Sequence, residues 1–250
     1  MRASRLSVTV ITLEEAHRLR RCLESVAWAD ELVVVDAESH DKTVQVAREF
    51  TDRVMVRPWP GFTAQKNFAL EQTTGDFILS LDADEEAAPE LRDEIGTILA
   101  GAPAHDGYAV RRRNVFLDRW IRHGGLYPDW QVRLVRRGRG RFVDRAVHES
   151  LAVTGTVGRL SSHLVHRSYE GVGDFVERAN RYASLAAEQL VRDGRRVRAG
   201  ELIARPLGRF LSMYVLKRGF LDGRRGLLLA TLYAYYVFMR SAKAWEVTRR

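Results

Sequence analysis

Short apolar runs alternate with helix-like segments through the first 85 residues of the chain. Two runs, residues 32–35 and 77–81, are continuous rather than alternating, which is typical of parallel strands covered on both faces. This order of strands and helices predicts a three-layer α/β sandwich. The predicted elements span residues 6–12, 15–26, 31–37, 41–50, 53–57, 62–72 and 76–81.

The pattern changes after residue 106. Residues 108–110 and 131–135 predict two further strands, with an arginine-rich loop between them. From residue 172 onward, apolar residues recur at spacings of three or four, which predicts an amphipathic helix. We therefore expect an α/β domain over residues 1–170 and a helical C-terminal region over residues 171–250. The apolar face of the first helix consists of Phe175, Ala179, Tyr182, Ala183, Ala186 and Leu190.

Charge is divided unevenly along the 250 residues, around a net value of +8. Residues 1–110 carry 11 Lys and Arg against 20 Asp and Glu, whereas the remaining residues carry 29 against 12. A basic half of this kind can face nucleic acid, an anionic membrane or a phosphorylated substrate. The single cysteine, Cys22, excludes an internal disulfide framework and is compatible with a reducing compartment.

The C-terminal region combines basic and apolar segments. Residues 192–225 hold ten Lys and Arg against three acids, and the apolar residues 226–239 follow. That run is shorter than the roughly 20 residues of a membrane-spanning helix, and no signal-peptide h-region opens the chain. The arrangement suits the headgroups of an anionic membrane, and a buried helix or a dimer seam is the alternative. We expect a cytoplasmic protein, peripheral on the inner face of the cytoplasmic membrane.

Carboxylates gather after three of the predicted strands, at residues 14–15, 36–41 and 82–86. The carboxyl ends of strands in such sheets are where ligands bind. Asp82 and Asp84 are two residues apart, so in an extended strand end both carboxylates point to the same side and can share one cation. Crowded carboxylates repel one another, so we expect Mg²⁺ or Mn²⁺ with Asp82 and Asp84 as ligands. An acidic loop that caps the next helix is the simpler alternative.

Other polar residues at the strand ends suit a nucleotide. Asp36 follows a buried strand, where a carboxylate can accept a hydrogen bond from a base N–H or a ribose hydroxyl. Lys66 can approach a phosphate or the base, and Thr12 and Glu15 follow the first strand. The alternatives are that Asp36 only caps a turn and that Lys66 is simply solvated.

Several motifs together resemble the family 2 glycosyltransferases of GT-A fold. The resemblance implies a nucleotide-diphospho-sugar transferase with a Rossmann-like mixed sheet flanked by helices and a C-terminal helical appendage. It rests on residues 7–12 (SVTVIT), 32–36 (LVVVD), 64–69 (AQKNFA) and 79–85 (LSLDADE). Residues 127–129 (YPD), 133–134 (RL), 147–149 (VHE) and 219–223 (GFLDG) look like the lipopolysaccharide-core β-glucosyltransferase branch.

The implied reaction is inverting transfer of a hexose from a UDP-glucose-like donor to a lipid-linked or lipopolysaccharide-core sugar. Two residues depart from the family's pattern. Glu14 replaces the asparagine of the usual Thr-x-Asn-Glu, and Glu38 replaces the glycine of the usual Asp-x-Gly-Ser-x-Asp. Both lie in loops expected to border the nucleoside. The resemblance therefore implies the metal role of Asp84 without fixing the donor base and sugar.

Inverting transfer needs a base that takes the proton from the acceptor hydroxyl as this hydroxyl attacks the anomeric carbon. Glu149 is the first candidate, because it lies just beyond an acceptor-side strand and resembles the family's His-Glu motif. Asp129 is the second. The alternatives are that Glu149 pairs with a neighbouring arginine and that His148 has a structural role.

The arginine-rich half of the chain bears on the acceptor, and two other functions have to be compared with glycosyl transfer. Arginines among residues 111–145 suit bidentate recognition of a phosphorylated lipid acceptor, or form a solvated surface that pairs in part with the acidic half. A nucleotidyltransferase would be expected to have a glycine-rich, basic phosphate loop near the first strand, which residues 12–15 lack. A nucleic-acid-binding module would not explain the acidic strand ends. We expect a nucleotide-sugar donor, a glycolipid or lipopolysaccharide-core acceptor, an anionic membrane and no nucleic acid; a polyprenyl-phosphate acceptor and a homo-oligomer stay open.

Overall fold

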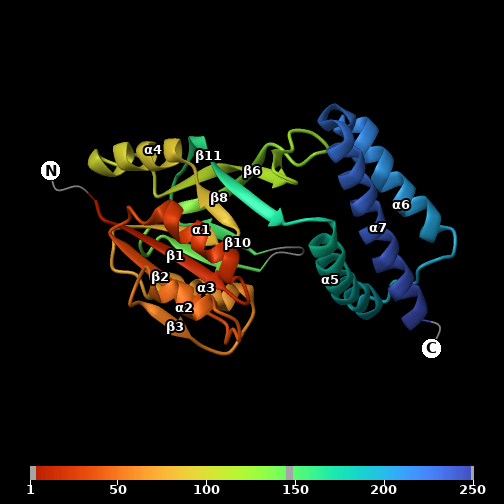
Figure 1. Ribbon diagram of the computed structural model, residues 1–250, viewed down its shortest axis with the longest axis horizontal. Helices are drawn as coiled ribbons and strands as arrows, with labels where there is room; N and C mark the ends of the chain where they lie inside the picture. Colours follow the sequence, from red (N-terminus) through yellow and green to blue (C-terminus); the bar gives the residue numbers. More distant parts are fainter. Residues whose placement is uncertain (1–3, 145–148, 249–250) are drawn as a thin grey trace. The chain divides into compact units, whose positions relative to one another are not determined.

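The computed structural model describes residues 4–144 and 149–248 (Figure 1). The chain forms two compact units, and each consists of two stretches of sequence. The first unit comprises Met1–Arg112 and Asp129–His166, and the second comprises Arg113–Pro128 and Arg167–Arg250. Two long strands, β6 (Gly107–Phe116) and β11 (Val157–Tyr169), therefore contribute residues to both units.

The first unit is built on a mixed sheet. Its strands follow the order β3-β2-β1-β4-β8-β6-β11-β5, and β7 (Arg119–Trp120) pairs with β6. Strands β1 to β4 are parallel, whereas β8 runs antiparallel to both β4 and β6, and β5 runs antiparallel to β11. The bounds are β1 Leu6–Thr12, β2 Glu31–Asp36, β3 Val54–Val56, β4 Phe77–Asp82, β5 Glu85–Ala87 and β8 Asp129–Arg136.

Helices cover both faces of this sheet because its strands are apolar on both sides. Val8 and Val34 pack into a core with side chains of α1, α2 and α4. Val33 and Val35 point to the opposite face, where they pack with Ala69 of α3. A small hairpin, β9 (Gly140–Val143) and β10 (Ser150–Val153), also covers that face. The helices span α1 Ala16–Val26, α2 Thr43–Arg48, α3 Phe62–Glu71 and α4 Pro89–Ala100.

The second unit is helical. Its helices are α5 (Val172–Arg192), α6 (Glu201–Leu211) and α7 (Gly223–Val247), and α7 packs against both of the others (Figure 1). The chain between α6 and α7 forms a π-helical segment, Ser212–Leu216, and a 3₁₀ turn, Gly219–Asp222. The core of this unit joins its loop residues to two helices and contains Phe116, Ile121, Phe175, Ala179, Leu229 and Leu232.

The predicted fold class is confirmed, and the first strand and third helix begin where the pattern placed them, at Leu6 and Phe62. The apolar run 226–239 belongs to α7, where Leu229, Ala230 and Leu232 are buried and Leu227 and Phe238 are exposed. Within the described ranges, the structure has no helix long and apolar enough to cross a membrane. The functional division into residues 1–170 and 171–250 stays a prediction.

Candidate active site

The carboxyl ends of β1, β2 and β4 meet at one edge of the sheet, because these strands are parallel and in register. Thr12 pairs with Asp36 across β1 and β2, and Ile11 pairs with Asp82 across β1 and β4. Strand β1 lies between β2 and β4, so the strand order switches here, and such a point is where α/β sheets bind ligands. The structure thus brings the predicted residues Thr12, Asp36 and Asp82 to one edge.

Asp82 lies between two cations. Its Oδ1 is 2.7 Å from Nζ of Lys66, and its Oδ2 is 2.6 Å from Nη2 of Arg133. Both cationic side chains are almost fully buried. Burial alone would raise the pKa of Asp82, but the Arg133 guanidinium and the Lys66 ammonium outweigh it and hold that pKa far below its usual range. Asp82 is therefore ionised, and its charge is compensated inside the protein.

Glu85 extends this network into the interior. Its side chain is fully buried, and its Oε1 lies 2.6 Å from Nη2 of Arg133 and 3.3 Å from Nη1 of Arg112. Its Oε2 accepts a hydrogen bond of 3.1 Å from the backbone N–H of Asp82. Arg112 comes from β6 and Arg133 from β8, so the antiparallel strands supply the cations that neutralise the carboxylates after β4. The sequence pattern places both arginines in a surface that either binds phosphate or is solvated and pairs in part with the acidic half, and pairing with carboxylates is observed.

Asp84 has different surroundings from Asp82. Its Oδ2 lies 3.5 Å from Nε2 of His166. The antiparallel pairing of β11 with β5 places His166 opposite Glu85, next to Asp84 in sequence. Burial would raise the pKa of Asp84, but the charge and hydrogen bond of His166 outweigh it and lower that pKa. A carboxylate oxygen and an imidazole nitrogen are both ligands for divalent metals.

Sequence reasoning missed His166. The residue lies in a long strand far from Asp84 along the chain, and no local motif connects the two. Over residues 4–144 and 149–248, no three side chains of the His, Cys, Asp and Glu types are grouped closely enough to hold a metal ion. Among the described residues, the protein thus offers Asp84 and His166 as a pair of candidate ligands at this point.

Both candidate bases pair with cations of the same network. Oε1 of Glu149 is 2.8 Å from Nζ of Lys66, and Oδ2 of Asp129 is 2.7 Å from Nη2 of Arg112. Burial would raise the pKa of Glu149, but Lys66 outweighs it and lowers that pKa, so the carboxylate is ionised at neutral pH. Glu149 thus has a lysine partner, and His148 lies outside the described residues.

Asp36 closes the loop after β2. Its buried carboxylate accepts hydrogen bonds from the backbone N–H of Ser39 at 2.8 Å and from the Ser39 hydroxyl at 2.6 Å. The turn-capping alternative is therefore observed in the structure. A contact between Asp36 and a nucleoside stays a prediction.

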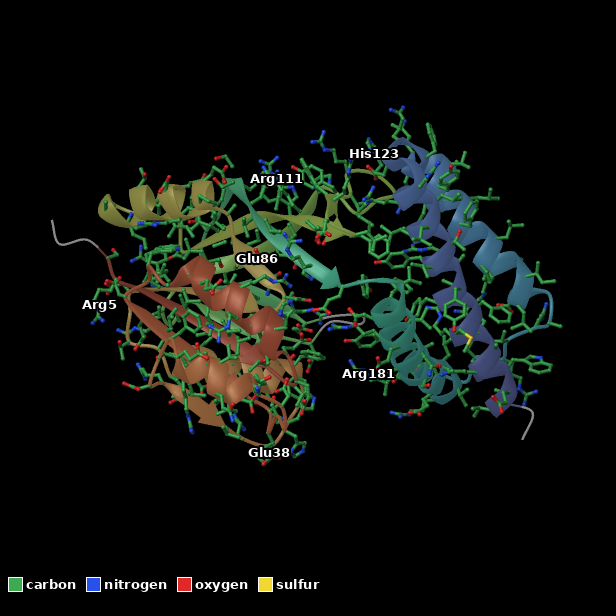
Figure 2. The ribbon with its side chains drawn as sticks, in the orientation of Figure 1. Arg5, Glu38, Glu86, Arg111, His123 and Arg181 are labelled. Atoms are coloured by element: carbon green, nitrogen blue, oxygen red, sulfur yellow. The ribbon has the colours of Figure 1, made fainter. Side chains whose placement is uncertain are left out.

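The two residues that depart from the family pattern both have left-handed backbones. The φ angles are +55° at Glu14 and +61° at Glu38, a region that asparagine and glycine adopt more readily than glutamate. Oε1 of Glu14 accepts a hydrogen bond of 2.7 Å from the backbone N–H of His40, which links the loop after β1 to the loop after β2. Glu38 is exposed on this second loop (Figure 2). The replacements thus place two carboxylates at positions with a left-handed backbone.

Buried polar atoms near the start of these loops lack partners within the described part of the chain. They are the hydroxyl of Thr12 and both polar atoms of the Gln65 side chain on α3. Buried polar groups are normally hydrogen-bonded, so such atoms are available to a ligand. The predicted residue Glu15, in contrast, has an ion pair of 2.8 Å with Arg18.

The sheet, its carboxylate edge and its antiparallel extension define the GT-A fold of nucleotide-diphospho-sugar transferases. In a structure comparison the chain is similar to the mannosyltransferase PcManGT of Pyrobaculum calidifontis, with a TM-score of 0.53 and 16% identity. The alignment covers 98% of this chain and 88% of that one.

The chain belongs to glycosyltransferase family 2, whose model, Glycosyl transferase family 2, matches residues 7–151. It is 32% identical to the lipopolysaccharide core biosynthesis glycosyltransferase LpsC of Rhizobium meliloti, over 96% of this chain and 92% of that protein. It is also 30% identical to an uncharacterized glycosyltransferase of Rickettsia felis, over 97% of this chain and 90% of the relative. The resemblance inferred from the sequence motifs is confirmed.

Proposed function

We propose that the protein is a metal-dependent, inverting glycosyltransferase that transfers a hexose from a UDP-hexose to a lipid-linked or lipopolysaccharide-core sugar. The observation that carries this proposal is the pairing of Asp84 with His166 beside the compensated carboxylate of Asp82. PcManGT, the structural neighbour, was solved in complex with GDP-Man and Mn²⁺. A shared fold and a compatible ligand pair support the same class of chemistry here.

The residues present fit Mg²⁺ or Mn²⁺. Both ions accept carboxylate oxygen, Mn²⁺ also accepts imidazole nitrogen, and such ions are commonly held by few protein ligands together with substrate phosphates. Asp84 and His166 would be direct ligands, and Asp82 as a further ligand stays a prediction. When bound, the metal ion would neutralise the charge that develops on the departing diphosphate.

Buried cations stand beside these ligands. Lys66 and Arg133 hold Asp82 in place, and their charges lie at the edge where the diphosphate would bind. Cations fixed in a buried network stabilise developing charge without reorganising during the reaction. Thr12, Glu15 and Asp36 remain the proposed contacts of the nucleoside. The direct support is the Thr12 hydroxyl, which has no hydrogen-bond partner among residues 4–144 and 149–248.

The base is proposed to be Glu149, with Asp129 as the alternative. Glu149 is ionised at neutral pH and shares Lys66 with Asp82, so it lies in the same network as the proposed diphosphate site. Its role would be to accept the proton of the acceptor hydroxyl as the oxygen attacks the anomeric carbon. Asp129 belongs to the same network through Arg112.

The acceptor class rests on similarity and on charge. The relative LpsC is named for lipopolysaccharide core biosynthesis, which supports an acceptor of that kind for this chain. Arg111 and Arg159 both lie over the ring of Trp130, with Cζ at 5.2 and 5.0 Å from its centroid. Arginines held against an aromatic ring suit a phosphorylated sugar. Such an acceptor would bring the enzyme to the inner face of the cytoplasmic membrane.

Donor hydrolysis tests the reaction class. Purified protein is incubated with UDP-, GDP- and ADP-hexoses, with Mn²⁺ or with a chelator, and nucleoside diphosphate release is measured. We expect release from a UDP-hexose only with the metal, and a loss of about a thousandfold in Asp84→Asn. Asp93→Asn, at an exposed aspartate of α4, is the matched control and should keep full activity. Metal-independent turnover, or full activity in Asp84→Asn, contradicts the proposal.

Two isosteric variants separate the candidate bases. Glu149→Gln should lower transfer to the acceptor by roughly 10²- to 10⁴-fold while the donor still binds. Asp129→Asn should have the smaller effect. The reverse result would assign the base to Asp129. The anomeric configuration of the product, measured by NMR, tests inversion independently of both variants.

A further inference from the structure

The outward face of helix α6 is apolar. Ile203, Leu207 and Leu211 lie four residues apart and are 74%, 54% and 44% exposed. Residues at this spacing share one side of a helix. Ala204 and Gly208 are the other exposed residues of α6, a helix that the structure describes in full, so its exposed face carries no charge. A surface helix normally presents its polar face outward.

Two charged residues of α6 pair with each other within the helix, and the third lies against α7. Arg205 forms an ion pair of 2.5 Å with Glu201, and the guanidinium of Arg209 lies over the ring of Tyr233 in α7, 5.3 Å from the ring centroid. The polarity of α6 is thus inverted relative to an ordinary surface helix. This inversion places apolar side chains in contact with whatever surrounds the protein.

The exposed apolar surface continues beyond α6. Leu216 is 78% exposed, and further exposed apolar side chains follow in the π-helical segment and the 3₁₀ turn. Large contiguous apolar patches mark interaction sites, whereas single exposed apolar residues are ordinary. We name this set the apolar ridge, and it comprises Ile203, Leu207, Leu211, Val215, Leu216, Phe220 and Leu221.

Cations bracket the apolar ridge. No acidic residue occurs between residues 202 and 221. Exposed basic side chains precede the ridge and follow its main part. They are Arg195, Arg196 and Arg198 before α6, and Lys217, Arg218 and Arg224 after it.

We propose that the apolar ridge docks on the surface of an anionic phospholipid bilayer. An amphipathic helix in the bilayer interface buries its apolar face at the headgroup boundary, and basic residues beside it attract anionic lipids. A second copy of the chain fits less well, because two ridges placed face to face would oppose cation to cation. The docking surface therefore comes from residues 203–221 of the second unit, where α6 packs against α7.

The docking surface belongs to the second unit and the carboxylate edge to the first, and the docking does not depend on donor chemistry. It predicts that the protein binds vesicles in the absence of any nucleotide-sugar or metal. A failure of vesicle binding would leave donor hydrolysis untouched, and a failure of donor hydrolysis would leave vesicle binding untouched.

Vesicle flotation tests the proposal on the full chain. Vesicles of phosphatidylcholine alone are compared with vesicles that also contain phosphatidylglycerol. We expect binding to the anionic vesicles, and a loss of at least about tenfold in a triple variant Ile203→Ser, Leu207→Ser and Leu211→Ser. The matched control removes three exposed apolar side chains elsewhere, through Val56→Ser, Val157→Ser and Leu185→Ser, and should bind as the wild type does.

Charge gives a second, independent readout. Replacing Lys217, Arg218 and Arg224 by Gln should weaken binding to anionic vesicles by roughly fivefold for each charge. Circular dichroism melts check that each variant is folded, and light scattering after gel filtration gives the oligomeric state. The proposal is overturned if the wild type ignores anionic vesicles, or if the folded ridge variant binds them unchanged. A ridge variant that only converts a dimer to a monomer would assign the ridge to a second copy.

Discussion

The two units of the molecule treat polarity in opposite ways. The first unit buries charge: Lys66, Asp82, Glu85 and Arg133 lie at the edge of its sheet with direct ion pairs between them. The second unit exposes apolar side chains on α6 and also on α7, where Leu227 and Phe238 are exposed. Buried charges cost free energy unless they are paired, and exposed apolar surface has no benefit in an isolated soluble protein. The buried charges are compensated within the chain, whereas the exposed apolar surface points to a partner outside it.

The contrast concerns the kind of ligand. A compensated buried network stays fixed when a charged substrate arrives, so it provides preorganised electrostatics for a small anionic molecule. An exposed apolar ridge gains free energy only when a large surface removes water from it. In the proposals above, the first unit accordingly binds a nucleotide-sugar and the second binds a membrane. The predictions below test this contrast, beginning with the largest expected effect.

Removing the central cation of the first unit should have the largest effect on folding. Arg133→Met leaves Asp82 and Glu85 with less compensation in the interior, and breaking a buried pair typically costs about 3–5 kcal/mol. Urea denaturation measures the free energy of unfolding. The control is Arg20→Met, since the pair of Arg20 with Glu49 is exposed and should leave the urea midpoint almost unchanged. Equal midpoints for the two variants would contradict a structural role of the network.

Buried and exposed leucines of the second unit should differ in how much they contribute to the free energy of unfolding. Leu229 in α7 is 3% exposed, so Leu229→Ala should lower the free energy of unfolding by about 2–5 kcal/mol. Leu207→Ala, on the apolar ridge, removes the same atoms from an exposed site. It should change the free energy of unfolding by less than about 0.5 kcal/mol. Thermal and urea unfolding of both variants provides the measurement. A large loss in Leu207→Ala would show that the ridge is packed within the protein.

Removing the imidazole beside Asp84 should weaken metal binding. In His166→Ala we expect the Mn²⁺ concentration for half-maximal donor hydrolysis to rise at least about tenfold, because even outer partners of metal ligands are worth 10- to 100-fold. Calorimetric titration with Mn²⁺ and UDP checks the affinity directly. His17→Ala, at an exposed histidine of α1, is the control. An unchanged metal dependence in His166→Ala would remove this residue from the site.

Acid should lower the stability of the protein through Glu94 in the first unit, and alkali should lower it through Tyr169 in the second. Hydrogen bonds from Ser161 and Ser162 outweigh burial and lower the pKa of Glu94, so its contribution is present above about pH 4.5 and is lost as the pH falls further. Burial, together with Tyr233, raises the pKa of Tyr169, so its contribution is present below about pH 10 and is lost as the pH rises through the higher folded value. Glu94→Gln should reduce the acid sensitivity of the urea midpoint, and Tyr169→Phe its alkaline sensitivity. Unchanged pH profiles would contradict these assignments.

Relieving the backbone strain in the loop after β2 should have the smallest effect on the free energy of unfolding. Glu38 has a φ of +61°, and glycine adopts this backbone without the cost that a Cβ imposes. Glu38→Gly should therefore raise the free energy of unfolding by up to about 1 kcal/mol. Glu38→Gln keeps the Cβ and removes only the charge, so it should leave stability unchanged. A gain in both variants would trace the effect to charge rather than to backbone strain.

Much of the first unit is predictable from local patterns. The continuous apolar runs at residues 32–35 and 77–81 indicated parallel strands, and β2 and β4 are such strands. The carboxylates after β4 were identified as a candidate site because the carboxyl end of a buried strand is a common place for ligands. These inferences succeed because strand burial and strand ends are recorded in short stretches of sequence.

Other parts of the site depend on residues far apart in the chain. His166 is adjacent to Asp84 only because β11 pairs with β5. Arg133 neutralises Asp82 only because β8 lies next to β4 in the sheet. Likewise, the pattern of residues 226–239 showed a strongly apolar segment but not which helix would be exposed.

The sequence by itself determined the α/β pattern, the carboxylate edge and the apolar and basic character of the C-terminal region. These properties depend on periodicity and composition, which act over a few residues. Only the tertiary structure decided that Lys66 and Arg133 compensate Asp82, that His166 accompanies Asp84 and that α6 turns its apolar face outward. The physical reason is that ion pairing and exposure depend on which distant strands and helices pack together.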